Sequence, residues 1–242
     1  MQKTITVLMY VYPPAGREGD MWPDFERSMR RAWHFFGPLK SVIVANRLFP
    51  ELERFVAENG NLSVQLEPSL IPGSTIPMSM DCITRLHSRF DTEEVLIVQN
   101  DGYPVRAGLE EFSGRYDFIG APSVRPSRQA LLAMLGLRSL CGGFSLRTKR
   151  ICVHAAKAWR FWRFFINPQT SRFFAEDVFY TTVLPLNPFF RMRYRIAPYR
   201  EARIFAYDSL GGEVSPPDGV RPLALHGKHT LAANEGASGD GF

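Results

Sequence analysis

The chain has 242 residues, of which 45% are hydrophobic and 22% are charged, with a net charge of +5. This composition is typical of a globular protein, and the length allows one α/β domain or two small ones. No apolar run approaches the roughly 18 residues of a membrane span. The apolar start lacks a signal-peptide cleavage site. Three cysteines give neither a disulfide framework nor a CxxC metal site, so we expect a reducing, cytoplasmic compartment.

The first hundred residues alternate apolar runs with helical spacing. Apolar, β-rich runs predict buried strands, and apolar residues that recur every three or four positions predict helices between them. Strands that alternate with helices favour a mostly parallel, doubly wound sheet, whose ligands lie beyond the carboxyl ends of the strands. The predicted strands are residues 4–12, 41–46, 62–68 and 94–99, and the predicted helices are residues 22–36, 50–59 and 79–90.

The second half of the chain is less regular. Residues 123–140 are basic at first and then apolar, and we interpret them as a long loop or a loose helix. We expect one domain over residues 1–231 and a flexible tail over residues 232–242, which are small and polar. The predicted strands here are residues 116–122, 194–198, 203–208 and 223–229, and the predicted helices are residues 175–184 and a segment that ends at Trp162.

Basic residues gather in three stretches that interleave Arg with aromatic residues, at positions 27–36, 157–165 and 190–195. Such stretches suit polyanions, whether nucleic acid, anionic lipid headgroups or pyrophosphate-linked substrates. They are equally typical of amphipathic helices whose Arg stems cover an aromatic core face, so both interpretations stay open.

Asn100-Asp101-Gly102 follows the predicted strand 94–99 directly, where a ligand site is expected. The oxygens of Asn100 and Asp101 are ligands that Mg²⁺ or Mn²⁺ accept, although an Asp-Gly turn is the simpler explanation. Further along, Gly142-Gly143 allows a ligand to approach the backbone, or simply forms a turn. Arg147 is either a phosphate partner or a surface residue of the following helix.

Glu176-Asp177 opens the predicted helix 175–184. Acids in a first turn usually complement the helix dipole, but one of them is a candidate general base. Adjacent helical residues point roughly 100° apart, so the sequence does not say which acid faces a site. His226 is either a structural hydrogen-bond donor or a metal ligand.

The order of these motifs resembles a known family. The strand with its acidic turn, then "YDFIGAP", "GGFSLR", "EDVF" and a late "HG", is similar over about residues 5–230 to bacterial and fungal conserved domains of unknown function. These domains belong with the A-type glycosyltransferases. The resemblance implies a single-domain, Rossmann-like α/β fold of that type, with a mostly parallel central sheet flanked by helices.

By this resemblance, Asp101 and His226 hold a divalent cation, Mn²⁺ or Mg²⁺, on the diphosphate of a nucleotide-sugar donor. The usual Asp-x-Asp motif is reduced here to a single carboxylate, so metal dependence stays open. Asp177, or else Glu176, is the implied general base of an inverting transfer. The implied donor contacts are Tyr10, Val11, Tyr12, Asn100, Asp101, Gly102, Gly142, Gly143, Phe144 and Arg147.

The expected partners follow from the same resemblance. We expect a UDP-sugar donor and a carbohydrate or lipid-linked glycan acceptor, as in polysaccharide or lipopolysaccharide biosynthesis. Residues 130–137 suggest a flexible lid, and the basic stretches suggest peripheral contact with an anionic membrane. Nucleic acid is not an expected partner. The alternatives are a nucleic-acid-binding module and a catalytically inactive relative that binds glycans.

Overall fold

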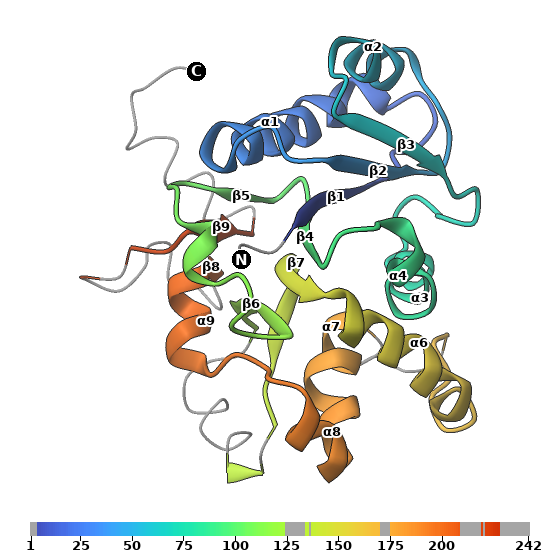
Figure 1. Cartoon of the computed structure of the whole chain (residues 1–242). Helices are drawn as coiled ribbons and strands as arrows, with labels where there is room; N and C mark the ends of the chain where they lie inside the picture. Colours follow the sequence, from blue (N-terminus) through green and yellow to red (C-terminus); the bar gives the residue numbers. More distant parts are fainter. Residues whose placement is uncertain are drawn as a thin grey trace.

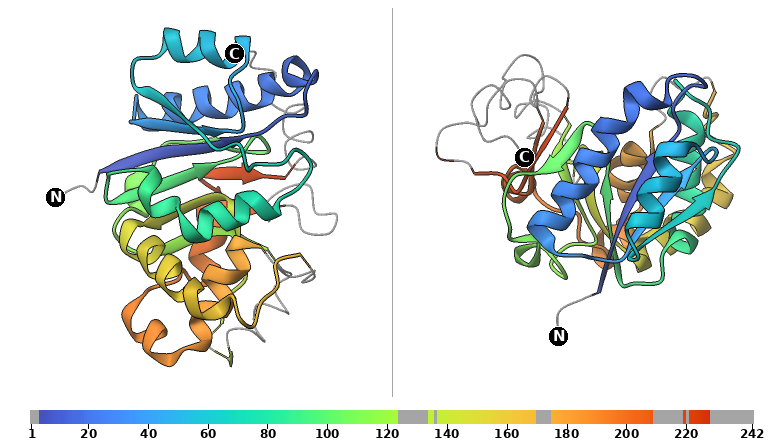
Figure 2. Two further views of the ribbon diagram at one scale, coloured as in Figure 1. Left: turned by 90° about the vertical axis from the view of Figure 1, so that its right-hand side faces the viewer. Right: turned by 90° about the horizontal axis from the view of Figure 1, so that it is seen from above.

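A computed structural model describes residues 4–123, 134, 135, 137–169, 175–208, 219 and 221–227. Most of the predicted lid and the whole predicted tail lie outside these residues. The described chain forms a central sheet between two layers of helices, with a smaller sheet beside it (Figures 1 and 2). None of the helices in these residues has the length and hydrophobicity needed to span a membrane.

The central sheet has the strand order β3-β2-β1-β4-β7-β6. The pairs from β3 to β4 are parallel, whereas β7 runs antiparallel to both β4 and β6. The mostly parallel α/β sheet predicted from the sequence is therefore confirmed. Every residue of β1, β2 and β4 is buried, and burial on both faces explains why these strands are continuous apolar runs. The strands are β1 (Ile5–Val11), β2 (Ser41–Ala45), β3 (Leu62–Leu66), β4 (Glu94–Val98), β6 (Phe118–Pro122) and β7 (Leu140–Thr148).

Two layers of helices cover the central sheet. Helices α1 and α2 lie on one side, and α3, α4 and α6 lie on the other (Figure 1). Trp22 of α1 packs edge-on against Phe49 and Phe55 around α2, which joins the two helices of the first layer. The helices are α1 (Glu18–Phe36), α2 (Pro50–Glu58), α3 (Ile76–Thr84), α4 (Leu86–Arg89), η1 (Leu109–Glu111), α6 (Lys149–Trp162), α7 (Glu176–Val178), η2 (Phe179–Val183), η3 (Leu184–Leu186), α8 (Pro188–Arg193) and α9 (Tyr199–Phe205).

The smaller sheet has the order β5-β9-β8 and brings together distant parts of the chain. Its strands are β5 (Gly102–Pro104), β8 (Ala206–Asp208) and β9 (Ala224–His226). The register sets His226 of β9 between Gly102 on one side and Asp208 on the other. Gly102, the first residue of β5, lies shortly after the end of β4 in the chain. Because His226 pairs with Gly102, it also lies near the end of β4.

Three predicted elements differ from the structure. The predicted strand at 203–208 is wrong over its first half: Ala202 and Phe205 are the buried residues of α9, three positions apart as on one helix face. The predicted helix at 79–90 is divided at Arg85 into α3 and α4. The predicted strand at 194–198 makes only an isolated bridge, between Ile196 and Phe118.

Candidate active site

Asp101 lies in the turn that follows β4. The N–H of Gln99 donates to Gly143 O of β7 at 2.9 Å, so the chain stays beside the sheet one residue beyond the strand. The N–H of Gly102 then donates to Gln99 O at 3.1 Å and closes the turn into β5. The Asp-Gly turn and the predicted position at the carboxyl end of the strand are thus both present.

His226 lies directly beside Asp101. Its Nε2 is 3.5 Å from Asp101 Oδ1, and the N–H of Gly227 donates to Asp101 O at 2.7 Å. Asp101 Oδ1 is buried and, among the described residues, has no hydrogen-bond partner. Two residues predicted as metal ligands, about 125 positions apart, therefore share one place in the fold.

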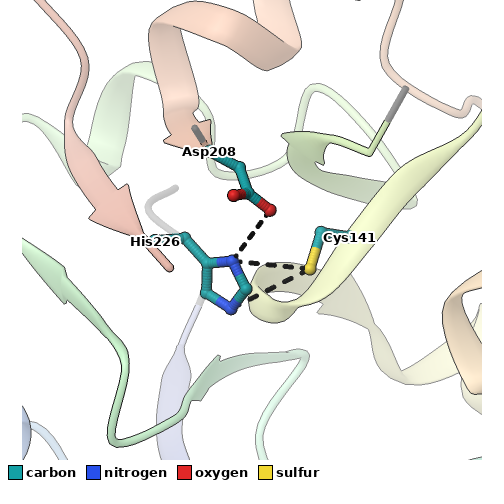
Figure 3. A group of neighbouring side chains, drawn as sticks. All are labelled: Cys141, Asp208 and His226. Carbon is teal, nitrogen blue, oxygen red and sulfur yellow. Dashed lines mark hydrogen bonds and ion pairs between the residues drawn. The ribbon is translucent and has the colours of Figure 1, made fainter. Parts of the chain in front are cut away.

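The other side of the His226 ring faces two residues that the sequence analysis did not single out. Its Nδ1 lies 3.2 Å from Asp208 Oδ2 and 3.6 Å from Cys141 Sγ (Figure 3). Burial lowers the pKa of His226, but Cys141 and Asp208 outweigh burial and raise that pKa well above its usual range. The ring is consequently an imidazolium held among acidic groups unless a cation replaces its proton.

Gly142 and Gly143 belong to strand β7 rather than to a turn, so the turn interpretation is wrong. Neither has a positive φ. Their lack of side chains instead makes room for neighbours on opposite faces of the strand. A Cβ on Gly142 would overlap Glu176 Oε1 and lie 2.7 Å from Arg147 Nη2, while a Cβ on Gly143 would overlap His226 Nε2.

Arg147 and Glu176 form a buried ion pair behind this strand. Arg147 is 0% exposed, which contradicts its interpretation as a surface residue. Its Nη2 lies 3.3 Å from Glu176 Oε1, and its guanidinium stacks 4.9 Å from the ring centroids of Phe118 and Tyr180. Ser79 Oγ donates to the second carboxylate oxygen, Glu176 Oε2, at 3.1 Å. Both oxygens of Glu176 are therefore engaged inside the protein.

Asp177 is in a different environment from its neighbour. It is half-buried, and the backbone N–H groups of Val178 and Gly142 donate to its carboxylate. Burial, followed by the charge of Glu176, raises the pKa of Asp177 to about 7. A carboxyl group that titrates near neutral pH is well suited to take a proton from a substrate, and this suits Asp177 rather than Glu176 to the role of a base.

The predicted donor contacts divide into two groups. Tyr12 is half-buried, and burial together with negative neighbours that include Glu176 and Asp101 raises the pKa of Tyr12 to about 12. The charges of both acidic parts of the site therefore act on Tyr12. By contrast, the side chain of Tyr10 is 2% exposed and donates its hydroxyl to Asp81 at 2.8 Å. Val11 and Phe144 are buried in the core.

The residues around Asp101 fit a divalent cation. A buried carboxylate oxygen without a hydrogen-bond partner faces an imidazole nitrogen, and both are common ligands of Mn²⁺-type ions. No local sequence pattern indicated Asp208 or Cys141 at this place. Asp208 ends a strand whose pairing with β9 is not local, and Cys141 has no neighbouring cysteine at ligand spacing.

Comparisons with known proteins define the class of fold. The apo form of the glycosyltransferase GlyE from Streptococcus pneumoniae TIGR4 matches with a TM-score of 0.53 at 13% identity, over 93% of this chain and 54% of its own. The mannosyltransferase PcManGT from Pyrobaculum calidifontis, in complex with GDP-Man and Mn²⁺, matches with a TM-score of 0.48 at 15% identity, over 81% of this chain and 54% of its own. The match to GlyE shows that the fold is that of the A-type glycosyltransferases. The chain spans about half the length of each of the two proteins.

The family follows from the sequence itself. Residues 78–226 match the family described as Protein of unknown function (DUF5672), and the chain belongs to this family. The matched segment contains the residues around His226 and the candidate base, namely Asp101, Cys141, Asp177, Asp208 and His226. No protein of curated function is detectably similar to the chain in sequence.

Proposed function

We propose that this protein is a glycosyltransferase that transfers a sugar from a nucleotide-sugar donor to a carbohydrate acceptor with inversion. The observation that carries the proposal is the difference between two adjacent acids. Glu176 is engaged by Arg147 and Ser79, whereas Asp177 is half-buried with a pKa raised to about 7. In the proposal, Asp177 takes the proton of the acceptor hydroxyl as the hydroxyl oxygen attacks the anomeric carbon.

The donor diphosphate lies at the tip of β4 in this proposal. Asp101 and His226 would hold a divalent cation, Mn²⁺ or Mg²⁺, which neutralises charge on the leaving diphosphate when it is bound. The orphaned Oδ1 of Asp101 and its 3.5 Å separation from His226 Nε2 support this assignment. Tyr12 and Asn100 are the proposed contacts to the rest of the donor, since both are half-buried beside the cluster.

The acceptor is proposed to be a lipid-linked glycan at an anionic membrane surface. Residues 178–200 contain no acidic residue, and neither do residues 137–175. On α8 and the end of α6, exposed aromatic and Met side chains alternate with exposed Arg residues. Such a surface suits insertion at a headgroup region. The exposed apolar residues are Phe161, Phe164, Phe165, Phe189 and Met192, and the exposed basic residues beside them are Arg160, Arg163, Arg191 and Arg193.

Liposome flotation tests the membrane contact. We expect the protein to float with anionic vesicles and not with neutral ones, and the double variant Phe164→Ser/Phe165→Ser to lose this binding. No preference for anionic vesicles would refute the membrane contact. Steep salt-dependent binding of an RNA or DNA oligonucleotide, with no response to vesicles, would instead favour a nucleic-acid-binding module.

A thermal-shift panel of nucleotide sugars tests the function. A ligand at 100 times its Kd stabilises a protein by about 2.7 kcal/mol, so a true donor raises Tm measurably. We expect a UDP-sugar to do so in the presence of Mn²⁺, and the panel includes GDP-sugars as alternative donors. Asp101→Ala is expected to weaken the shift and His226→Ala to weaken it less. A panel with no stabilising nucleotide sugar, with or without metal, would contradict the proposal.

A further inference from the structure

The two nitrogens of His226 face different chemical groups. Nε2 lies 3.5 Å from the carboxylate oxygen of Asp101 and 3.9 Å from Cys141 Sγ. Nδ1 faces a carboxylate and a thiol together, with Asp208 Oδ2 at 3.2 Å and Cys141 Sγ at 3.6 Å (Figure 3). Asp101 thus contacts Nε2 and Asp208 contacts Nδ1, whereas Cys141 contacts both nitrogens and lies closer to Nδ1.

Two carboxylates, those of Asp101 and Asp208, face the one imidazole ring of His226. His226 is 7% exposed, and the imidazole can carry at most one positive charge. In the described part of the chain, no Lys or Arg pairs with Asp101 or Asp208. A single Nδ1–H can also serve only one of its two neighbouring acceptors. A cation on this side could accept ligands from both Cys141 and Asp208.

The two separations measured from Nδ1 match those of ligands around one tetrahedral ion. Zinc lies about 2.0–2.2 Å from nitrogen and oxygen ligands and about 2.3 Å from sulfur, which separates tetrahedral ligands by about 3.4 Å for N···O and about 3.6 Å for N···S. The observed separations from Nδ1 are 3.2 Å to Asp208 Oδ2 and 3.6 Å to Cys141 Sγ. All three ligand atoms lie within 4.8 Å of one another.

We propose that Cys141, Asp208 and Nδ1 of His226 form a binding site for a thiophilic divalent cation, Zn²⁺ foremost. Thiolate and imidazole together favour Zn²⁺ over Mg²⁺ or Mn²⁺, and three protein ligands leave a fourth position open. The ligands come from the start of β7 and the ends of β8 and β9. The bound ion therefore fastens the smaller sheet to the edge of the central one.

This site has a consequence for donor binding that rests on the proposed function. A neutral imidazole has one lone pair and one N–H. When Nδ1 binds Zn²⁺, Nε2 carries the proton and donates it to Asp101, as ligating histidines usually do to a carboxylate. His226 and Asp101 then no longer bind the donor cation together, so Zn²⁺ antagonises a donor that needs Mn²⁺.

Wild-type protein tests the site without any substitution. We expect one Zn²⁺ per chain to remain after dialysis, and Co²⁺ in its place to give a thiolate-to-cobalt charge-transfer band. Zn²⁺ is also expected to protect Cys141 from alkylation, read by mass spectrometry, with buried Cys82 and Cys152 as internal references. Absence of both retained Zn²⁺ and protection of Cys141 would overturn the proposal.

Paired variants locate the ion on one side of the ring. Cys141→Ser is expected to weaken Zn²⁺ binding by more than the roughly 10–100-fold that loss of an outer partner costs, and Asp101→Asn is the control that stays within that range. Equal losses in the two variants would put the ion on the Nε2 side and refute the site. Zn²⁺ is expected to weaken donor binding in wild type and not in Cys141→Ser. If no donor binds at all, the proposed function fails, while the Zn²⁺ titration still tests this site.

Discussion

The adjacent acids Glu176 and Asp177 are expected to respond to neutralisation in opposite ways. In Glu176→Gln, the fully buried guanidinium of Arg147 loses its ion-pair partner at 3.3 Å. Its remaining partners, Ser145 Oγ at 3.1 Å from Nε and Gly142 O at 3.5 Å from Nη2, are neutral, and Nη1 has no hydrogen-bond partner among the described residues. Removing one partner of a buried pair costs about 3–5 kcal/mol, a large part of the 5–15 kcal/mol that holds a typical domain folded.

The magnitude for Glu176→Gln belongs at the lower end of that range, about 3 kcal/mol. The amide of Gln keeps the size of the side chain and can still accept the hydrogen bond of Ser79. In Asp177→Asn, by contrast, no buried cation loses its partner. Asn also removes the cost of ionising a carboxyl whose pKa is raised by burial, so we expect Asp177→Asn to be at least as stable as wild type at pH 7, while transfer falls about 10²–10⁴-fold.

Urea unfolding followed by tryptophan fluorescence, together with a transfer assay on folded protein, separates the two effects. The reasoning predicts an unstable Glu176→Gln and a stable, inactive Asp177→Asn that still binds donor. Wild-type stability of Glu176→Gln would refute the account of the Arg147 pair. Wild-type turnover of Asp177→Asn would refute its assignment as the base.

Further predictions concern pH and the glycine strand. Below pH 7 the transfer rate is expected to fall about tenfold per pH unit, because the pKa of Asp177 near 7 leaves less of its basic form; a rate that is flat from pH 5 to 8 would argue against it. The pKa of Asp177 is higher in the folded protein than in the unfolded chain. Between about pH 4 and 7, the folded protein therefore keeps a proton on Asp177 that the unfolded chain has lost. Stability is therefore expected to fall by up to about 1.4 kcal/mol per unit as pH rises through that window, and Asp177→Asn should remove this dependence in urea titrations at several pH values. Gly143→Ala is expected to displace His226 and weaken metal-dependent donor binding about 10–100-fold by calorimetry, whereas Gly60→Ala, whose added Cβ meets nothing within 4 Å, should bind donor like wild type.

Local patterns were enough to predict the parallel strands of the central sheet, because a strand that is buried on both faces consists of consecutive apolar residues. The runs at 4–12, 41–46 and 94–99 contain β1, β2 and β4 to within one or two residues. The position of Asp101 at a strand end followed from the same patterns. Which of Glu176 and Asp177 faces inwards did not, since it depends on Arg147, about 30 residues away.

The residues that the sequence did not predict are joined by long-range pairing. Asp208 lies beside His226 only because β8 and β9 are neighbours, and Cys141 lies near both only because β7 begins at the same place in the fold. The role of Gly142 and Gly143 was harder still to predict from the sequence, since it depends on side chains that approach them from opposite faces of the strand. Such contacts have no periodicity in the sequence.

The most direct test of the account is the position of a bound metal. Crystals grown with a nucleoside diphosphate and Mn²⁺ would give an anomalous signal from the ion. We expect a peak at coordination distance from Asp101 and from Nε2 of His226, beside the diphosphate. A diphosphate bound elsewhere on the protein, with no ion at Asp101, would contradict it.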